Sequence, residues 1–393
     1  MAKIAIIHPW LPQYRLPFFA LLLKKAALAG HDVRIFHGAV PPEWQARGDA
    51  VEVPAVATML PTRWIGVGRF KLALRSLRPL RRSGQFDLIV VEQAVRNLET
   101  YRLMLSAGVP RLAMWGHGRT FTKPTGRFQE AFKLALTRRG DWFFAYTKGG
   151  ADHIASKGYP EGRTTVVFNT IDSAGLAAAV NGVDEQALVD FKASHALHKH
   201  TAVFIGGLDG SKRLDFLLSA GDAVALTHPT FKLLIIGEGD LGGWLAEQAK
   251  SRSWVVLLGH ATGEVKAKSL AAARAIVMPG RVGLVSVDSF AAAVPLVTTD
   301  YRWHAPEFEY LHAGENAIVT ANDVASFSAG ITSLLDDDDL QRRIANECRV
   351  NATAFSVDAM VDRFVQGLEQ ASRVRPQRRA FYLRRLRSAV SCR

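Results

Sequence analysis

The stretch that decides the fold is residues 201–220, which read TAVFIGGLDGSKRLDFLLSA. The apolar, β-branched run Ala202–Gly206 predicts a buried strand, and the helical periodicity of Leu214–Leu226 predicts a helix. Between them, a glycine-containing loop carries two adjacent cations, Lys212 and Arg213. A strand that passes through such a loop into a helix is the repeating unit of parallel sheets, so this stretch predicts an α/β fold.

The same alternation recurs along both halves of the chain. Nearly continuous apolar runs, typical of strands buried on both faces, alternate with helical segments such as Phe18–Ala29. This pattern predicts two doubly wound α/β domains that meet near Asp172. The predicted strands are Lys3–Ile7, Val33–His37, Leu88–Glu92, Leu112–Trp115, Phe143–Thr147 and Val166–Phe168, then Ala202–Gly206, Leu233–Gly237, Val255–Gly259, Ala275–Pro279, Leu296–Thr299 and Ala317–Val319.

Composition excludes several classes of protein. The 393 residues are 48% hydrophobic, which excludes disordered, collagen-like and low-complexity chains. Two cysteines exclude a disulfide framework and a multi-cysteine zinc site. The N-terminus does not resemble a signal peptide and no apolar run is long enough to span a bilayer, so we expect a soluble or peripheral protein of a reducing compartment. The net charge of +13 leaves nucleic acid, an anionic membrane and phosphorylated substrates open as partners.

Polar groups at the carboxyl ends of the predicted strands are the candidates for chemistry. No G-x-G-x-x-G or Walker motif is present, which disfavours a nicotinamide dehydrogenase and a Walker NTPase. His117 lies between two glycines after a strand, where it either faces a substrate or is hydrogen-bonded in a turn. Lys212 and Arg213 follow Gly206 and Gly207 and form either a diphosphate site or a solvated pair. Because cations at a helix start oppose the helix dipole, the pattern favours the diphosphate site.

A second glycine-containing loop follows Ala275–Pro279. Gly280 and Gly283, with the helix start behind them, offer backbone N–H groups to an anion. Asp288 either accepts from ribose hydroxyls or is an acid that the helix dipole favours at this position. A metal site is disfavoured at the histidine-rich stretch because no cysteine accompanies its histidines, His195, His198 and His200.

Five segments share the pattern of a known family. They are VVFNTID at 166–172, FIGGLDGSKRLDFLLSA at 204–220, LIIGEG at 234–239, VLLG at 256–259 and VSVDSFAAAVPLV at 285–297. Their order and spacing resemble the family 4 glycosyltransferases, retaining enzymes that use sugar nucleotides and have the GT-B fold. The resemblance covers about residues 2–371.

The resemblance implies two Rossmann-like domains that face a cleft. Residues 1–172 would form the acceptor-side domain and residues 173–353 the sugar-nucleotide donor domain. A helix at 354–372 would cross back to the first domain, and a basic tail would follow at 373–393.

The resemblance also implies roles for single residues. Lys212 would bind the donor diphosphate, Asp288 the donor ribose, and His117 would face the transferred sugar. Arg15 would contact the acceptor or its phosphate. The remaining donor-binding positions would be Gly206, Gly207, Arg213, Gly259, His260, Gly283, Leu284 and Val285.

Two departures from the family pattern affect the donor site. The family's diphosphate arginine falls on Gly207, and Arg213 would replace its charge. The first of the family's paired glutamates has no counterpart, and Arg281 occupies that shorter loop. The implied mechanism is stabilisation of the leaving diphosphate by Lys212, Arg213 and helix amides, with no metal or other cofactor expected.

The positive charge is concentrated in two stretches. Arg63–Arg82 holds seven Lys and Arg and no acid, and Arg373–Arg393 holds eight arginines and no acid. Helical spacing in both predicts interfacial helices on an anionic membrane, with a surface helix and a solvated tail as the alternatives. We therefore expect a cytoplasmic enzyme on the inner face of the plasma membrane that extends a lipid-linked or saccharide acceptor. A non-catalytic nucleotide-sugar-binding protein remains an alternative, whereas nucleic-acid binding is disfavoured because no reader motif accompanies the charge.

Overall fold

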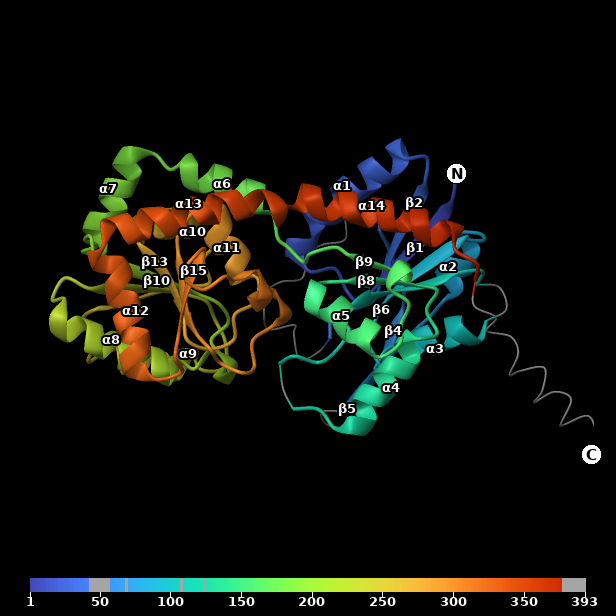
Figure 1. The fold of residues 1–393 in the computed structure, drawn as a ribbon, viewed down its shortest axis with the longest axis horizontal. Coiled ribbons are helices and arrows are strands. Elements are labelled where there is room, and N and C mark those ends of the chain that lie inside the picture. The colour runs from blue at the N-terminus through green and yellow to red at the C-terminus, as the bar shows by residue number, and fades with distance from the viewer. Residues whose placement is uncertain (42–56, 68–69, 107–108, 123, 377–393) are drawn as a thin grey trace, which may run out of the picture. The chain divides into compact units, whose positions relative to one another are not determined.

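The computed structural model describes residues 1–41, 57–67, 70–106, 109–122 and 124–376. The chain forms two compact units. The first contains the described residues of Met1–Thr120, Pro124–Phe168 and Met360–Arg393, and the second those of Phe121–Lys123 and Asn169–Ala359. Each unit is built on a parallel sheet with helices, so the predicted α/β class with two doubly wound domains is confirmed (Figure 1).

In its described part, the first unit has a seven-stranded sheet in the order β3-β2-β1-β6-β7-β8-β9, with every pair parallel. The order reverses between β1 and β6, so the loops that follow these two strands diverge and leave room for a ligand. The strands are β1 (Lys3–His8), β2 (Asp32–His37), β3 (Ala57–Met59), β6 (Leu88–Glu92), β7 (Leu112–Gly116), β8 (Trp142–Ala145) and β9 (Thr164–Val166). The helices are α1 (Leu16–Leu28), α2 (Arg78–Arg82), α3 (Leu98–Leu105), α4 (Arg127–Thr137), α5 (Lys148–Ser156) and most of α14 (Val357–Arg373).

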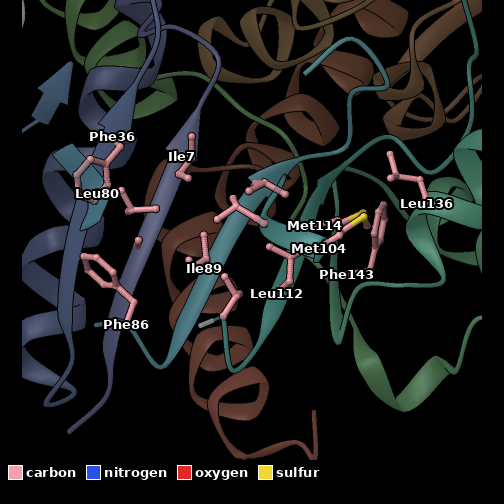
Figure 2. Close-up of a cluster of buried hydrophobic side chains, with 14 of the residues drawn as sticks. Ile7, Phe36, Leu80, Phe86, Ile89, Met104, Leu112, Met114, Leu136 and Phe143 are labelled. Atoms are coloured by element: carbon pink, nitrogen blue, oxygen red, sulfur yellow. The ribbon is translucent and has the colours of Figure 1, made fainter. Parts of the chain in front are cut away.

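Alternate residues of these strands fill the core on one face of the sheet (Figure 2). Ile7 of β1, Ile89 of β6 and Phe143 of β8 are buried with side chains from the helices that cover this face. Each such side chain contributes about 1.5–3 kcal/mol when it leaves water. The other labelled members of the cluster are Phe36, Leu80, Phe86, Met104, Leu112, Met114 and Leu136.

Helix α14 belongs to the first unit from Met360 onwards, although it follows the whole of the second unit in the sequence. Its Phe364 stacks on Phe144 with ring centres 4.3 Å apart and meets Trp115 and Phe18 edge-on. A Cβ on Gly367 would lie 2.5 Å from Phe144, so only glycine lets the helix approach the sheet this closely.

The predicted helix over Arg63–Arg82 is wrong. This stretch forms the antiparallel hairpin β4 (Thr62–Val67) and β5 (Phe70–Arg75), and only its end is helical, as α2. The hairpin is tied to the unit through Arg75, which donates to Glu99 Oε1 at 2.5 Å and to Asn97 Oδ1 at 3.0 Å. The helical spacing was not decisive because the same apolar positions also fit a strand, and the β-branched and aromatic residues of this stretch favour a strand.

In its described part, the second unit has a six-stranded parallel sheet in the order β12-β11-β10-β13-β14-β15, which reverses between β10 and β13. The strands are β10 (Thr201–Ile205), β11 (Lys232–Ile236), β12 (Val255–Gly259), β13 (Ala275–Met278), β14 (Leu296–Thr299) and β15 (Ala317–Thr320). The helices are α6 (Ser173–Asn181), α7 (Glu185–Ser194), α8 (Leu214–Thr227), α9 (Gly242–Ala249), α10 (Gly263–Ala272), α11 (Val285–Ala292), α12 (Val324–Asp336) and α13 (Asp338–Ala354).

The structure does not describe the basic tail beyond residue 376, so the interfacial helix predicted over Arg373–Arg393 lies mostly outside the described residues. Among the helices that are described, none has the length and apolar character needed to cross a membrane.

Candidate functional site

The donor-binding residues predicted in the second half, apart from Gly259 and His260, lie around the switch point of the second sheet. The loop after β10 and the loop after β13 are packed together there. A Cβ on Gly280 would lie 2.4 Å from Ser211 O and 2.6 Å from Lys212 C, so glycine is required for this backbone contact. The two glycine-containing loops that the sequence singled out therefore form one continuous surface at the carboxyl ends of β10 and β13.

Lys212 ends a short 3-10 turn, Gly210–Lys212, that follows β10. Asp209 fixes this turn because its Oδ1 accepts from Ser211 N at 2.8 Å and its main-chain oxygen accepts from Lys212 N at 3.0 Å. The Lys212 ammonium donates to Arg281 O at 2.6 Å, which holds it over the loop after β13. An ammonium that the main chain positions in this way can bind an anion.

Contacts with Phe216, Asn322 and Pro279 hold the Arg213 side chain in place. Arg213 has a left-handed backbone, with φ of 55°, and its guanidinium lies 4.0 Å from the ring centre of Phe216. It donates to Asn322 Oδ1 and, at 3.3 Å, to Pro279 O. These contacts fix Arg213 at the base of the β13 loop, and its role in replacing the family's arginine stays a prediction.

The loop from Val282 to Val285 presents backbone donors. Val282 N donates to His304 Nδ1 at 3.0 Å, and His304 Nε2 lies 2.9 Å from Thr299 O. Burial, with the nearby Lys212 charge opposing protonation, lowers the pKa of His304 to about 4, so it holds this loop as a neutral ring. Across the described residues, no acceptor is found for the N–H groups of Gly283, Leu284 and Val285. These groups stand at the start of α11, where the helix dipole also favours an anion.

Asp288, in the first turn of α11, is almost fully buried and pairs with Lys266 of α10, whose Nζ lies 2.6 Å from Asp288 Oδ1. Sequence reasoning missed Lys266 because the lysine precedes Asp288 on a separate helix. The pair holds Asp288 Oδ1 on Lys266, so the second oxygen of Asp288 is the one that could accept from a ribose hydroxyl. Gly259 and His260, predicted at the nucleotide base, are exposed at the carboxyl end of β12, where Gly259 has a left-handed φ of 64°.

Arg281 occupies the short loop after β13, where the sequence lacks the first of the family's paired glutamates. Its guanidinium donates to Thr122 O at 2.9 Å, from a short segment that belongs to the second unit. The Arg281 Nε and the Ser211 Oγ are both buried without a hydrogen-bond partner among the described residues. Unsatisfied buried groups are costly, so polar atoms of this kind beside Lys212 favour a ligand-binding role for the loop.

In the first unit, Arg15 is buried rather than exposed at the mouth of its loop. Its guanidinium carbon lies 5.1 Å from the Trp115 ring centre and 5.3 Å from that of Tyr146. Burial, and then the Arg15 charge, lowers the pKa of neighbouring His8 to about 3. Burial also raises the pKa of Glu92, at the end of β6, to about 6. The first switch point is therefore lined by the Arg15 cation, by a His8 ring that is neutral at pH 7, and by a Glu92 carboxyl that takes up a proton at a higher pH than usual.

His117 directly follows β7 and its ring lies 4.5 Å from that of Tyr146. Its Nδ1 is buried with no hydrogen-bond partner among the described residues. Burial, together with the charges of Lys133 and Arg15, lowers the pKa of His117 to about 3. A neutral imidazole can form a hydrogen bond with a hydroxyl group through such a nitrogen, but it carries no positive charge at neutral pH.

The chain has two doubly wound units, and the second carries Lys212 and the first N–H groups of α11 at its switch point. This arrangement is that of the two-domain enzymes of the GT-B type. Comparison with known proteins identifies the family. A model described as "Glycosyltransferase Family 4" matches residues 18–174, and one described as "Glycosyl transferases group 1" matches residues 199–337. The chain therefore belongs to the family 4 glycosyltransferases, and the resemblance drawn from the sequence is confirmed.

Curated relatives match over part of their length. A glycogen synthase of Mycobacterium tuberculosis is 30% identical over 159 residues, which is 39% of this chain and 38% of the relative. An exopolysaccharide phosphotransferase of Streptomyces coelicolor is 29% identical over 196 residues, which is 47% of this chain and 20% of the relative. The chain thus spans well under half the length of these two proteins.

Solved structures match over nearly the whole chain. Anabaena HepE in complex with UDP-glucose aligns with a TM-score of 0.66 and 14% identity, over 95% of this chain and 100% of that one. TarM of Staphylococcus aureus, solved with UDP, fondaparinux and α-GlcNAc-glycerol, aligns with a TM-score of 0.63 and 10% identity, over 93% and 99%. At these identities the likeness shows the GT-B fold.

Proposed function

We propose that this protein transfers a sugar from a nucleotide-sugar donor to a lipid-linked or saccharide acceptor, with retention of configuration, in the assembly of a cell-surface polysaccharide or glycolipid. The observation that carries the proposal is the set of hydrogen-bond donors at the carboxyl ends of β10 and β13, which could bind an anion. There, the Lys212 ammonium is held 2.6 Å from Arg281 O, and the N–H groups that begin α11 have no acceptor within the described part of the chain. The similar proteins solved with UDP and UDP-glucose support a uridine nucleotide as the first donor to test.

In this proposal the donor diphosphate lies between Lys212 and the start of α11. As the glycosidic bond breaks, negative charge grows on the leaving diphosphate, and the ammonium and helix amides stabilise it. Asp288 holds the ribose through the oxygen that Lys266 leaves available. We propose that the reaction needs no metal or other cofactor, because protein donors supply the charge stabilisation.

The first unit supplies the acceptor side of the proposed reaction. A neutral His117 would hydrogen-bond the transferred sugar, since its Nδ1 has no other partner among the described residues. Arg15, enclosed by aromatic rings, would place a fixed positive charge behind the acceptor. A buried cation is screened little by salt, so it would act on a phosphorylated acceptor at physiological ionic strength.

The decisive experiment is UDP binding and UDP-glucose turnover for Lys212→Met and for a matched control, Lys232→Met. Lys232 also donates to a main-chain oxygen, Ser253 O at 2.7 Å, but it lies at the opposite end of the sheet. We expect Lys212→Met to lower UDP affinity and turnover at least tenfold while Lys232→Met leaves both unchanged. Equal behaviour of the two variants would show that Lys212 does not bind the donor.

A second candidate is a protein that binds nucleotide sugars without transferring them. Arg281 favours it, because the family has a glutamate in this loop and here the guanidinium is committed to Thr122 O. Tight UDP-glucose binding with neither hydrolysis nor transfer to any acceptor would support this candidate. Release of UDP that depends on an added acceptor would exclude it.

We also propose that the protein works on the inner, cytoplasmic face of the plasma membrane. One face of the β4–β5 hairpin exposes Ile65 and Leu72, which are 47% and 38% accessible and are cross-strand partners. Arg63 is exposed on the same face, whereas Arg75 is turned inward to Glu99. Exposed apolar side chains next to a cation suit an anionic lipid surface.

Vesicle co-sedimentation tests the membrane proposal. The full chain should bind vesicles of phosphatidylcholine with phosphatidylglycerol more tightly than vesicles of phosphatidylcholine alone. The double variant Ile65→Ser, Leu72→Ser should bind the anionic vesicles several-fold more weakly. Equal binding to both kinds of vesicle would count against an anionic surface, and unchanged binding of the variant would count against the hairpin.

A further inference from the structure

Three side chains of the kinds that bind metals lie together near the amino end of β10. The donor loops are at the other end, where β10 and β13 finish. His200 immediately precedes β10, His228 immediately follows α8, and Asp336 is the last residue of α12. The strand between His200 and Gly206 has five residues and spans roughly 16 Å, so this group is well separated from Lys212. Of the stretch His195, His198 and His200 considered in the sequence, only His200 joins it.

The three side chains converge on one point. One ligand atom from each lies within 4.8 Å of the others. His228 Nε2 is 2.9 Å and His200 Nε2 is 3.8 Å from Asp336 Oδ1. Two atoms bound to a tetrahedral zinc ion at about 2.0–2.1 Å are roughly 3.4 Å apart. Both histidine–carboxylate distances differ from this value by about half an ångström, and all three ligand atoms lie within 4.8 Å of one another, so rotation of the exposed Asp336 carboxylate and the two rings would bring them to one ion.

Hydrogen bonds behind the rings orient both imidazoles. His228 Nδ1 lies 2.8 Å from Thr227 Oγ1, and the Thr227 hydroxyl donates to Val224 O at 3.1 Å. Because that hydroxyl proton is used, Thr227 Oγ1 accepts from His228 Nδ1–H, and His228 Nε2 is the nitrogen that faces the Asp336 carboxylate. His200 Nδ1 has the same kind of partner, Thr230 Oγ1 at 2.9 Å. Second-shell donors and acceptors of this kind are typical of metal-binding histidines.

A cation held between these three ligand atoms would bind to all of them. The nearest lysine and arginine do not supply it, because Lys199 and Arg274 are both drawn to Asp338, at 3.2 and 2.8 Å. Among the described residues, the ion-pair partners of Asp336 are the two histidines. Asp336 is half exposed, so an ion can enter and water can complete its coordination.

We propose that His200, His228 and Asp336 bind a divalent transition-metal ion of the Zn²⁺ type. Two imidazoles with one carboxylate suit zinc, cobalt or nickel, whereas magnesium and calcium prefer oxygen ligands throughout. The ion would join the start of β10 to the ends of α8 and α12, three points that are distant in the sequence. Its effect would be to stabilise the second unit, and it is independent of the proposed transfer reaction.

Zinc titration by calorimetry, with the full chain free of affinity tags, tests the site. The wild-type protein and His198→Ala, an exposed histidine two residues from His200, should bind the same number of zinc ions. His228→Ala and Asp336→Asn should bind one fewer, or bind that ion at least tenfold more weakly. The same zinc stoichiometry and affinity in all four proteins would overturn the proposal.

A second measurement keeps the test valid should His228→Ala fail to fold. Co²⁺ added to the wild-type protein should give the strong visible absorption of a four-coordinate site, and Zn²⁺ should abolish it. Zinc should also raise the melting temperature of the wild type and of His198→Ala, but not of Asp336→Asn. A six-coordinate cobalt spectrum or equal thermal shifts would contradict the site. UDP binding should be unchanged in Asp336→Asn, so the outcome does not depend on the proposed transfer activity.

Discussion

Replacing Gly280 with alanine should disable the donor loop while the protein stays folded. The new Cβ would lie 2.4 Å from Ser211 O, whereas ordinary contacts begin at 3.4 Å, so the turn carrying Lys212 must retreat. That retreat is about 1 Å, and a misplacement of this size can cost on the order of 100-fold in rate. Overpacking itself costs about 1–3 kcal/mol, which a domain with a stability of about 5–15 kcal/mol can tolerate.

The matched control for Gly280→Ala is Gly210→Ala. Gly210 is in the same turn, but no atom lies within 4 Å of its would-be Cβ. Both variants would be measured for UDP affinity by calorimetry, UDP-glucose turnover and urea unfolding. We expect turnover about 100-fold lower and UDP affinity reduced for Gly280→Ala, and near-normal values for Gly210→Ala. If the folded Gly280→Ala protein matched the control within threefold, the contact would not be what positions Lys212.

Three other expectations concern stability and are measured by chemical denaturation. Lys266→Met should cost about 3 kcal/mol, more than Asp288→Asn, because it leaves a buried carboxylate without its partner; equal losses would contradict this. Burial lowers the pKa of His8 and His117 to about 3. Between pH 6.5 and pH 3, therefore, the unfolded chain binds these two protons and the folded chain does not. The free energy of unfolding should decrease as the pH is lowered through this range. A constant free energy across that window would refute the assignment. Phe364→Ala should cost about 3–5 kcal/mol, since its ring is fully buried against Phe144, and a loss below 1 kcal/mol would show that α14 is not anchored there.

The strands of the two parallel sheets were predictable, except the short edge strand β3, because parallel strands buried on both faces leave long apolar runs, whereas β3 is only three residues long and largely exposed. The hairpin was not predictable, since Phe70 and Leu74 fit both the helical period and, with Leu72, the period of a strand. What decides between them is the tertiary anchor of Arg75 on Glu99, which lies on a different element. Local periodicity does not carry that information.

The candidate site was predictable only where its residues lie close together in the sequence. Glycines and Lys212 form one loop, so the anion-binding character of that loop is visible in residues 206–212. The Lys266–Asp288 pair and the His200–His228–Asp336 group each combine different elements, so only the folded chain brings them together. The burial of Arg15 was also invisible, because its aromatic neighbours Trp115 and Tyr146 come from later strands.

The place of α14 has a consequence for how the chain is made. Its Phe364 covers Trp115 and Phe144, so the first unit lacks part of its core until residues beyond Met360 leave the ribosome. The second unit, which is complete by Ala359, can therefore fold first although most of it is synthesised later. Until α14 has been synthesised, the strands of the first unit expose the apolar surface that Phe364 later covers. A chaperone would matter most during this period.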